Sequence, residues 1–160
     1  MARALILACG NPLRGDDGVG LRIVEELKRV CRSEEIEIAV AQQLLPEMAE
    51  QISEAEIVIF VDASVTQEPG SIAFEPVVTS EGDSESFTHR LSPQTLLRLA
   101  GTLYGRSPAH AFALNVGVGS CELNEGLSEP ARSSIPQAVG TILDFFAREI
   151  SRPIQVVPGS

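Results

Sequence analysis

The sequence predicts an α/β fold, a three-layer α/β/α sandwich around a mostly parallel, twisted sheet. Apolar runs typical of strands alternate almost strictly with helical patterns, as in parallel sheets that helices cover on both faces. Two runs, at residues 4–9 and 57–61, are apolar throughout, which is typical of strands buried on both faces. The chain of 160 residues is expected to form one domain over residues 1–150, followed by a tail at 151–160.

The first part of the chain predicts three strands and two helices. Strands are expected from the apolar runs at residues 4–9, 36–40 and 57–61. A helix is expected after the first strand, because four apolar residues recur there at helical spacing, with charged residues between them. These four residues are Val19, Ile23, Leu27 and Val30. Pro46 predicts a short helix that reaches about residue 52, since proline suits the first helical turn.

The second part predicts two more strands and two longer helices. Strands are expected at residues 71–78, after the Pro69-Gly70 turn, and at 111–118. Ser92-Pro93 predicts the start of a helix that ends near Gly105, because serine caps helices and proline suits the position that follows. The last helix is expected from residue 128 to about 150, where Pro136 either kinks or restarts it, with Ser134 as a candidate cap. The polar, acidic segment 79–86 is expected to be a mobile loop.

Charge and composition exclude several classes of protein. The net charge is −10 and no basic stripe is present, so nucleic acid and anionic membranes are not expected partners. Cys9, Cys31 and Cys121 show no metal-type spacing, and we interpret them as reduced thiols, with Cys9 inert in a buried strand. The N-terminus lacks a signal-peptide pattern, and no apolar stretch approaches the ~20 residues of a membrane span. A cytoplasmic protein is therefore expected.

The most informative stretch is residues 10–20, which follow the first strand and open the first helix. A glycine-rich turn in this place commonly binds phosphate at the helix N-terminus. Here Asp16 and Asp17 would repel a phosphate, so the turn suits a cation or a peptide group that needs acid–base help. The alternative is that Asp16 or Asp17 only caps the helix. Sequence patterns of P-loop, dinucleotide-binding, serine-hydrolase and H-E-x-x-H proteins are absent from the sequence.

Asp17, Asp62 and His89 form the candidate site. Asp17 follows the first strand and Asp62 ends the strand at 57–61, so both are expected at the carboxyl edge of the sheet, where sites of open α/β sheets lie. His89 precedes the Ser92 helix and would reach the same crevice. Two carboxylates and one imidazole suit a divalent transition metal. The alternatives are that Asp62 caps a turn and that His89 is an ordinary exposed histidine; His110 is not expected to be a ligand.

The chain resembles the hydrogenase maturation proteases in a series of motifs that covers nearly its whole length. The first motif is Gly10-Asn11-x-Leu13-x-x-Asp16-Asp17-Gly18-Val19-Gly20, and the others lie at residues 60–63, 88–93, 103–105, 117–123 and 125–128. The resemblance implies a phosphorylase/hydrolase-like sandwich with five strands, one of them antiparallel, for which 71–78 is the candidate. It implies that Asp17, Asp62 and His89 contact the metal and carry out catalysis. In some members the histidine lies later, where this chain has Gln94.

The resemblance also implies a function. Such proteases are cytoplasmic endopeptidases that remove a C-terminal extension from the large-subunit precursor of a nickel–iron hydrogenase after nickel insertion. The nickel belongs largely to the substrate, and zinc or cadmium is expected to fit the same ligands in vitro. The general base stays open between Asp16, Asp17 and a metal-bound water. The alternatives are a nickel-binding chaperone of the large subunit without protease activity and a metallohydrolase of small substrates. A monomer is expected.

Overall fold

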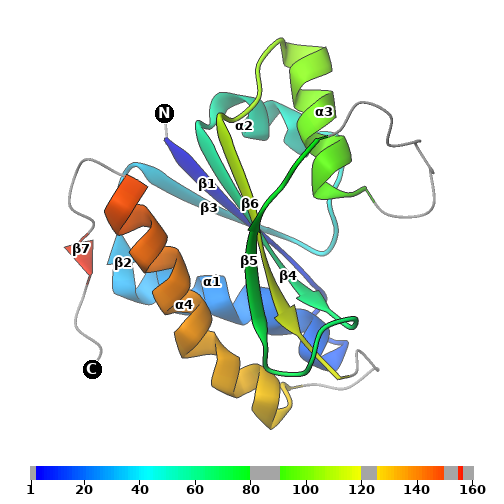
Figure 1. The fold of residues 1–160 in the computed structure, drawn as a ribbon, viewed down its shortest axis with the longest axis vertical. Helices are drawn as coiled ribbons and strands as arrows, with labels where there is room; N and C mark the ends of the chain where they lie inside the picture. Colours follow the sequence, from blue (N-terminus) through cyan, green and yellow to red (C-terminus); the bar gives the residue numbers. More distant parts are fainter. Residues whose placement is uncertain (1–2, 80–90, 120–125, 150–154, 157–160) are drawn as a thin grey trace.

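The computed structural model describes residues 3–79, 91–119, 126–149 and 155–156. Its centre is a five-stranded sheet in the order β3-β1-β4-β6-β5 (Figure 1). The strands are β1 (Ala4–Cys9), β3 (Ile36–Ala41), β4 (Ile57–Ser64), β5 (Ile72–Pro76) and β6 (His110–Gly117). All neighbours pair in parallel except β5, which is antiparallel to β6. The mostly parallel sheet and the antiparallel strand expected at 71–78 are therefore confirmed.

Helices cover both faces of the sheet, which confirms the three-layer sandwich (Figure 1). One face carries α1 (Val19–Val30) and α4 (Glu129–Glu149), which pack against each other as well as the sheet. The other face carries α2 (Met48–Glu54) and α3 (Pro93–Tyr104). A short 3₁₀ turn, η1 (Gly15–Gly18), leads into α1. In the part of the chain that is described, no helix combines the length and the apolar character needed to cross a membrane.

The alternation of side chains along each strand divides the core in two. On β1, Ala4, Ile6 and Ala8 pack with α1 and α4, whereas Leu5 and Leu7 pack with α2 and α3. All five are at most 2% exposed. Because successive side chains of a strand point to opposite faces, a run buried on both faces must be apolar at every position. This requirement explains why 4–9 and 57–61 were the clearest strand signals.

The ends of α3 follow the predicted capping pattern. The Ser92 hydroxyl accepts a hydrogen bond from the Thr95 backbone N–H at 3.1 Å, and Pro93 is the first helical residue. Gly105 ends the helix with φ 73°, a left-handed conformation that glycine adopts without steric cost. Both predicted boundaries are confirmed.

One expectation at the C-terminal end needs correction, and one small sheet there was not predicted. Helix α4 continues through Pro136, so the predicted restart is wrong; Ser134 is buried and donates to the Ala131 carbonyl at 2.6 Å instead of capping a new helix. A second sheet joins β2 (Cys31–Arg32) to β7 (Gln155–Val156). Such two-residue strands carry no periodicity that a sequence pattern can show. Apart from Thr79, the loop predicted at 79–86 lies outside the described residues.

Candidate functional site

The order of the strands places a crevice at the carboxyl end of β1. Strand β1 pairs with β3 on one side and with β4 on the other, so the chain connections that follow β1 and β3 run to opposite sides of β1. Connections that diverge from one strand in this way leave a crevice beyond the strand ends, where ligands of open α/β sheets bind. The loop from β1 to α1 and the end of β4 border this crevice, so the sheet brings Asp17 and Asp62 to one place as predicted.

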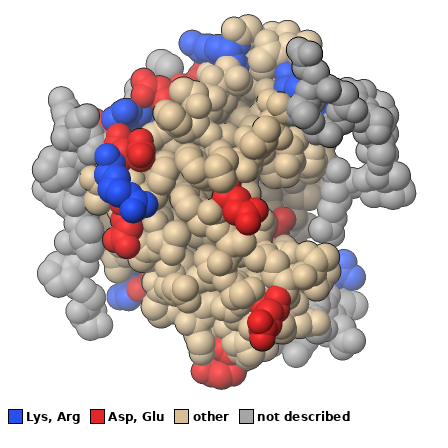
Figure 2. Space-filling model, in the orientation of Figure 1, with Lys and Arg blue, Asp and Glu red and all other residues tan. Residues whose placement is uncertain are grey.

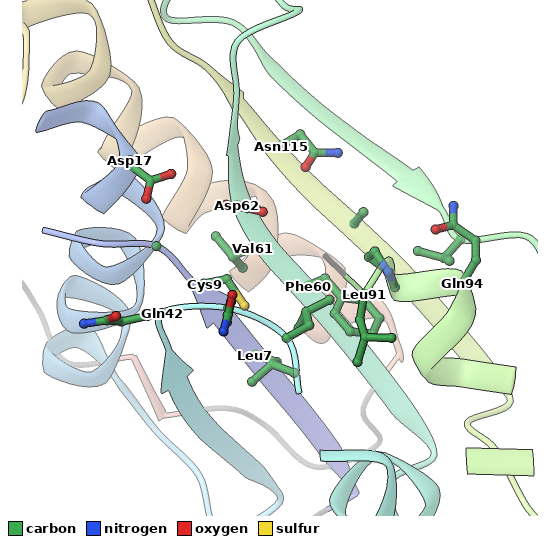
Figure 3. A pocket seen from close by; sticks show the side chains of 16 residues that line it. Leu7, Cys9, Asp17, Gln42, Phe60, Val61, Asp62, Leu91, Gln94 and Asn115 are labelled. Carbon is green, nitrogen blue, oxygen red and sulfur yellow. The ribbon is translucent and has the colours of Figure 1, made fainter. Parts of the chain in front are cut away.

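A cavity of about 230 Å³ occupies this crevice, and both Asp17 and Asp62 line it (Figure 3). Its apolar floor comes from the sheet and includes Leu7 and Phe60. Its rim includes the start of α3 with Gln94. Among the described residues that line it, none is lysine, arginine or histidine. The cavity therefore suits a cation or a peptide better than an anion.

Strand periodicity aims Asp62 into the cavity. Val58 and Phe60 are buried against α2 and α3, and Asp62 is the next residue of β4 on that same face. Because β4 continues to Ser64, Asp62 lies within the strand, and the alternative of a turn cap is wrong. Its Oδ1 accepts a hydrogen bond from the Ala63 N–H at 2.8 Å. Partial exposure at the end of the apolar strand leaves this carboxylate accessible from the cavity.

The loop of residues 10–18 holds Asp17 in place. The Asn11 backbone N–H donates to Asp17 Oδ2 at 2.8 Å. The Asn11 side chain accepts from the Leu13 N–H at 2.9 Å, a local turn that asparagine favours. A Cβ on Gly10 would lie 2.0 Å from the Asp17 carbonyl oxygen, so only glycine permits this approach. Asn11 and Gly10 therefore shape the turn.

Asp16 faces away from the cavity and has a different partner. It is only 4% exposed, and its two oxygens accept from the Ser128 N–H at 2.7 Å and the Ser128 hydroxyl at 2.6 Å. Ser128 precedes α4, so Asp16 ties the loop to that helix. The expectation that Asp16 or Asp17 caps α1 is wrong, because Gly18 is at the N-cap and no side-chain cap bond forms there. Asp17 is thus the member of the pair that lines the cavity.

Cys9 lines the cavity together with the two carboxylates (Figure 3). Burial, and to a smaller extent the negative charges of Asp62 and Asp17, together raise the pKa of the Cys9 thiol from 9.0 to about 12. Both aspartates thus act on one sulfur atom. Because a thiol is a nucleophile only as the thiolate, Cys9 is inert near neutral pH, in agreement with its predicted role.

Of the two histidines in the sequence, only His110 lies within the described residues. His89 lies outside the described residues, as does Cys121, so the role of His89 stays a prediction. His110 is exposed and pairs with Ile57 at the start of β4, roughly 16 Å along the strand from the carboxyl edge. Within the described ranges, no group of three or more histidine, cysteine or acidic side chains could hold a metal. The described part of the site is therefore a pair of carboxylates.

Several carboxamides that line the cavity were not predicted as site residues. They are Gln42, Gln43, Gln94 and Asn115. Asn115 left a signal in the sequence, because it is the only amide within the apolar strand expected at 111–118. The two glutamines after β3 left none, since polar residues after a strand are typical of any loop.

Fold and site together define an α/β protein with two carboxylates at the switch point of a five-stranded sheet. Over 98% of this chain and 97% of the other, with a TM-score of 0.75 and 25% identity, it is similar to the hydrogenase maturating endopeptidase HybD from E. coli. An endopeptidase from Escherichia coli, solved in solution, has a TM-score of 0.76 and 25% identity over 99% of each chain.

A third structure shows the same fold at lower identity. The [NiFe] hydrogenase maturation protease HycI from Thermococcus kodakarensis has a TM-score of 0.73 and 23% identity over 91% of this chain and 93% of its own. No family model and no curated protein matches the sequence. The resemblance to the hydrogenase maturation proteases is thus confirmed by structural neighbours over nearly the whole chain, and their names agree with the predicted enzyme class, a peptidase.

Proposed function

We propose that this protein is an endopeptidase that removes a C-terminal extension from the large-subunit precursor of a nickel–iron hydrogenase. The observation that carries the proposal is the pair Asp17 and Asp62, which line one cavity at the switch point of the sheet. Two structural neighbours, one named as a hydrogenase maturating endopeptidase and one named as an endopeptidase, each at 25% identity over nearly the whole chain, support the reaction class. The protein acts as a monomer in the cytoplasm.

In this proposal the nickel is part of the substrate. Asp17 and Asp62 complete its coordination, and His89 supplies the third ligand, since carboxylate and imidazole both suit divalent transition metals. Without nickel, two carboxylates face the cavity with no lysine, arginine or histidine among its described lining. Their mutual repulsion disfavours closure of the site on precursor that lacks the metal. This explains how the enzyme would distinguish loaded from empty precursor.

The chemistry is hydrolysis of one peptide bond. A water molecule attacks the scissile carbonyl carbon, and an aspartate takes the proton that the water loses. The carbon–nitrogen bond then breaks, and the same proton passes to the leaving amine. Asp17 and Asp62 are the candidates for this base. Asp16 is disfavoured, because Ser128 occupies both of its oxygens.

The test is a processing assay resolved by mass. The purified protein is mixed with nickel-loaded and nickel-free precursor from the same organism. Loss of mass at the precursor C-terminus, in the loaded sample alone, is the expected result. The variants Asp17→Asn, Asp62→Asn and His89→Ala are expected to keep the fold and lose processing. Binding of the precursor without cleavage would favour the nickel-binding chaperone, whereas turnover of free peptides with a resident metal would favour the small-substrate metallohydrolase.

A further inference from the structure

Asn115 is a polar residue in an otherwise apolar part of the sheet, and it lies next to Asp62. In the parallel pair of β4 and β6, Asp62 and Asn115 are register partners, on strands about 4.8 Å apart. Both line the same cavity, and Figure 3 shows them on neighbouring strands at the same end of the sheet. Register partners on adjacent parallel strands point to the same face. The Asn115 carboxamide is thus placed beside the carboxylate.

The position of Asn115 is held firmly by its neighbours. Leu114 and Val116 are fully buried on the opposite face of the sheet, and β6 is paired on both sides, with β4 and with β5. The Asn115 side chain is half-buried, and no hydrogen bond joins it to any other described residue. A rigid strand therefore presents an accessible carboxamide to the cavity.

Hydrolysis of a peptide bond in this cavity calls for a hydrogen-bond donor, and the Asn115 carboxamide can supply one. When water attacks a peptide carbonyl, negative charge develops on the carbonyl oxygen, and two nearby carboxylates disfavour that charge. Carboxylates only accept hydrogen bonds when ionised. Among the described residues of the lining, the side-chain donors are the carboxamides and the weakly donating Cys9 thiol. Asn115 is the carboxamide that lies on the sheet in register with Asp62.

We propose that Asn115 is a catalytic residue whose Nδ2–H donates a hydrogen bond to the scissile carbonyl oxygen as negative charge develops there. The inference rests on the proposed endopeptidase function and adds a group to it. Water loses a proton to an aspartate and bonds to the carbonyl carbon, while the Asn115 amide holds the oxyanion. The carbon–nitrogen bond then breaks, the carbonyl re-forms, and the aspartate returns the proton to the amine. Asn115 itself gains and loses no proton.

The experiment measures kcat and KM for the nickel-loaded precursor with the N115L variant. Leucine matches the size of asparagine but donates no hydrogen bond. Removal of one such donor is expected to lower kcat by about 10²- to 10³-fold, with KM little changed, because the bond forms mainly in the transition state. Gln137→Leu on the exposed surface of α4 is the matched control, and its kcat is expected to equal that of the unchanged protein.

A second variant separates this role from a structural one. N115D has the same shape, donates only as a neutral carboxylic acid, and adds a negative charge beside Asp62. Its activity relative to the unchanged protein is expected to rise as the pH falls; a ratio independent of pH would overturn the proposal, as would an unchanged kcat for N115L. If N115L fails to fold, the N115D ratio alone decides. If the unchanged protein fails to cleave any loaded precursor, the endopeptidase function itself is wrong, and the inference about Asn115 falls with it.

Discussion

The bond between Asp16 and Ser128 joins the site loop to α4, and its removal tests how the loop is held. The Ser128→Ala change removes the hydroxyl that donates to Asp16 Oδ2 at 2.6 Å. A hydrogen bond to a charged group contributes about 1.5–3 kcal/mol. The same hydroxyl accepts from the Ala131 N–H at 3.4 Å, a cap that adds up to about 1 kcal/mol. We therefore expect Ser128→Ala to lower the free energy of unfolding by about 2–4 kcal/mol.

A double-mutant cycle isolates the contact. Ser128→Ala leaves Asp16, which is only 4% exposed, without the hydroxyl donor, and Asp16→Ala removes the acceptor, whereas the double variant removes both side chains. The double variant is therefore expected to lose less than the sum of the single losses, by about 1.5–3 kcal/mol. Ser133→Ala is the matched control in the same helix, since Ser133 is exposed and bonds only to Glu129 at 3.0 Å. Its cost is expected to stay within about 0.5 kcal/mol.

Urea denaturation followed by far-ultraviolet circular dichroism suits this protein, because the chain has no tryptophan. Each variant gives a midpoint and a slope, from which the free energy of unfolding follows. Losses that add within about 0.5 kcal/mol would refute the reasoning, since they would mean that Asp16 and Ser128 stabilise the fold independently. A cost for Ser133→Ala equal to that of Ser128→Ala would refute it as well.

Three further predictions concern the rest of the site and its frame. Asp17→Asn and Asp62→Asn are expected to abolish processing of the nickel-loaded precursor while the thermal midpoint changes little. Gly10→Ala, whose Cβ would lie 2.0 Å from a backbone oxygen, is expected to lower the midpoint, whereas Gly140→Ala, with nothing within 4 Å, is expected to stabilise α4 by about 0.5–1 kcal/mol. For Cys9, whose folded pKa of about 12 exceeds the ordinary 9.0, stability is expected to fall above pH 9 relative to Cys9→Ala.

The sign and the measurement of the Cys9 effect follow from proton linkage. Above pH 9 the unfolded chain loses the thiol proton while the folded chain keeps it, so the contribution of Cys9 is complete below pH 9 and is lost as the pH approaches 12. The difference between the two proteins is expected to change by up to about 1.4 kcal/mol per pH unit in this window. A constant difference from pH 8 to 10.5 in denaturation curves would contradict it. For the other changes, normal processing by either asparagine variant, or equal midpoints for the two glycine variants, would be the contrary result.

The sheet could be predicted closely because burial leaves a clear pattern. The run 4–9 matches β1 in full, and the antiparallel strand was expected two residues longer at its end than β5 is. Short elements could not be predicted, since β2 and β7 have two residues each and form only because distant parts of the chain meet. Pro136 misled the prediction for a related reason. A proline destabilises a helix locally, which the sequence shows. The tertiary packing that keeps the helix continuous, through buried residues on both sides of Pro136 such as Ala131 and Ala138, is not visible in the sequence.

A site residue could be predicted from the sequence only where its position at the end of an apolar run was enough to locate it. Asp17 and Asp62 each follow an apolar run, and the rule for carboxyl ends of strands brought them together. The separate role of Asp16 could not be predicted, because its partner is 112 residues away and two adjacent aspartates look alike in a sequence. Identifying Asn115 as a site residue required the register between β4 and β6, which the apolar pattern of single strands does not give. His89 stays a prediction.

The bond between Asp16 and Ser128 also has a consequence for the newly made chain. Acidic side chains lie exposed on the face of the molecule that Figure 2 shows, whereas Asp16 is only 4% exposed and its partner Ser128 lies 112 residues later in the chain. At about 5–20 residues per second, a ribosome takes roughly 6–22 s to make that segment. Until then the loop that carries Asp17 lacks its anchor. A nascent chain is therefore expected to have an incomplete candidate site until Ser128 has left the ribosome, so that cleavage by the proposed endopeptidase is not expected before then.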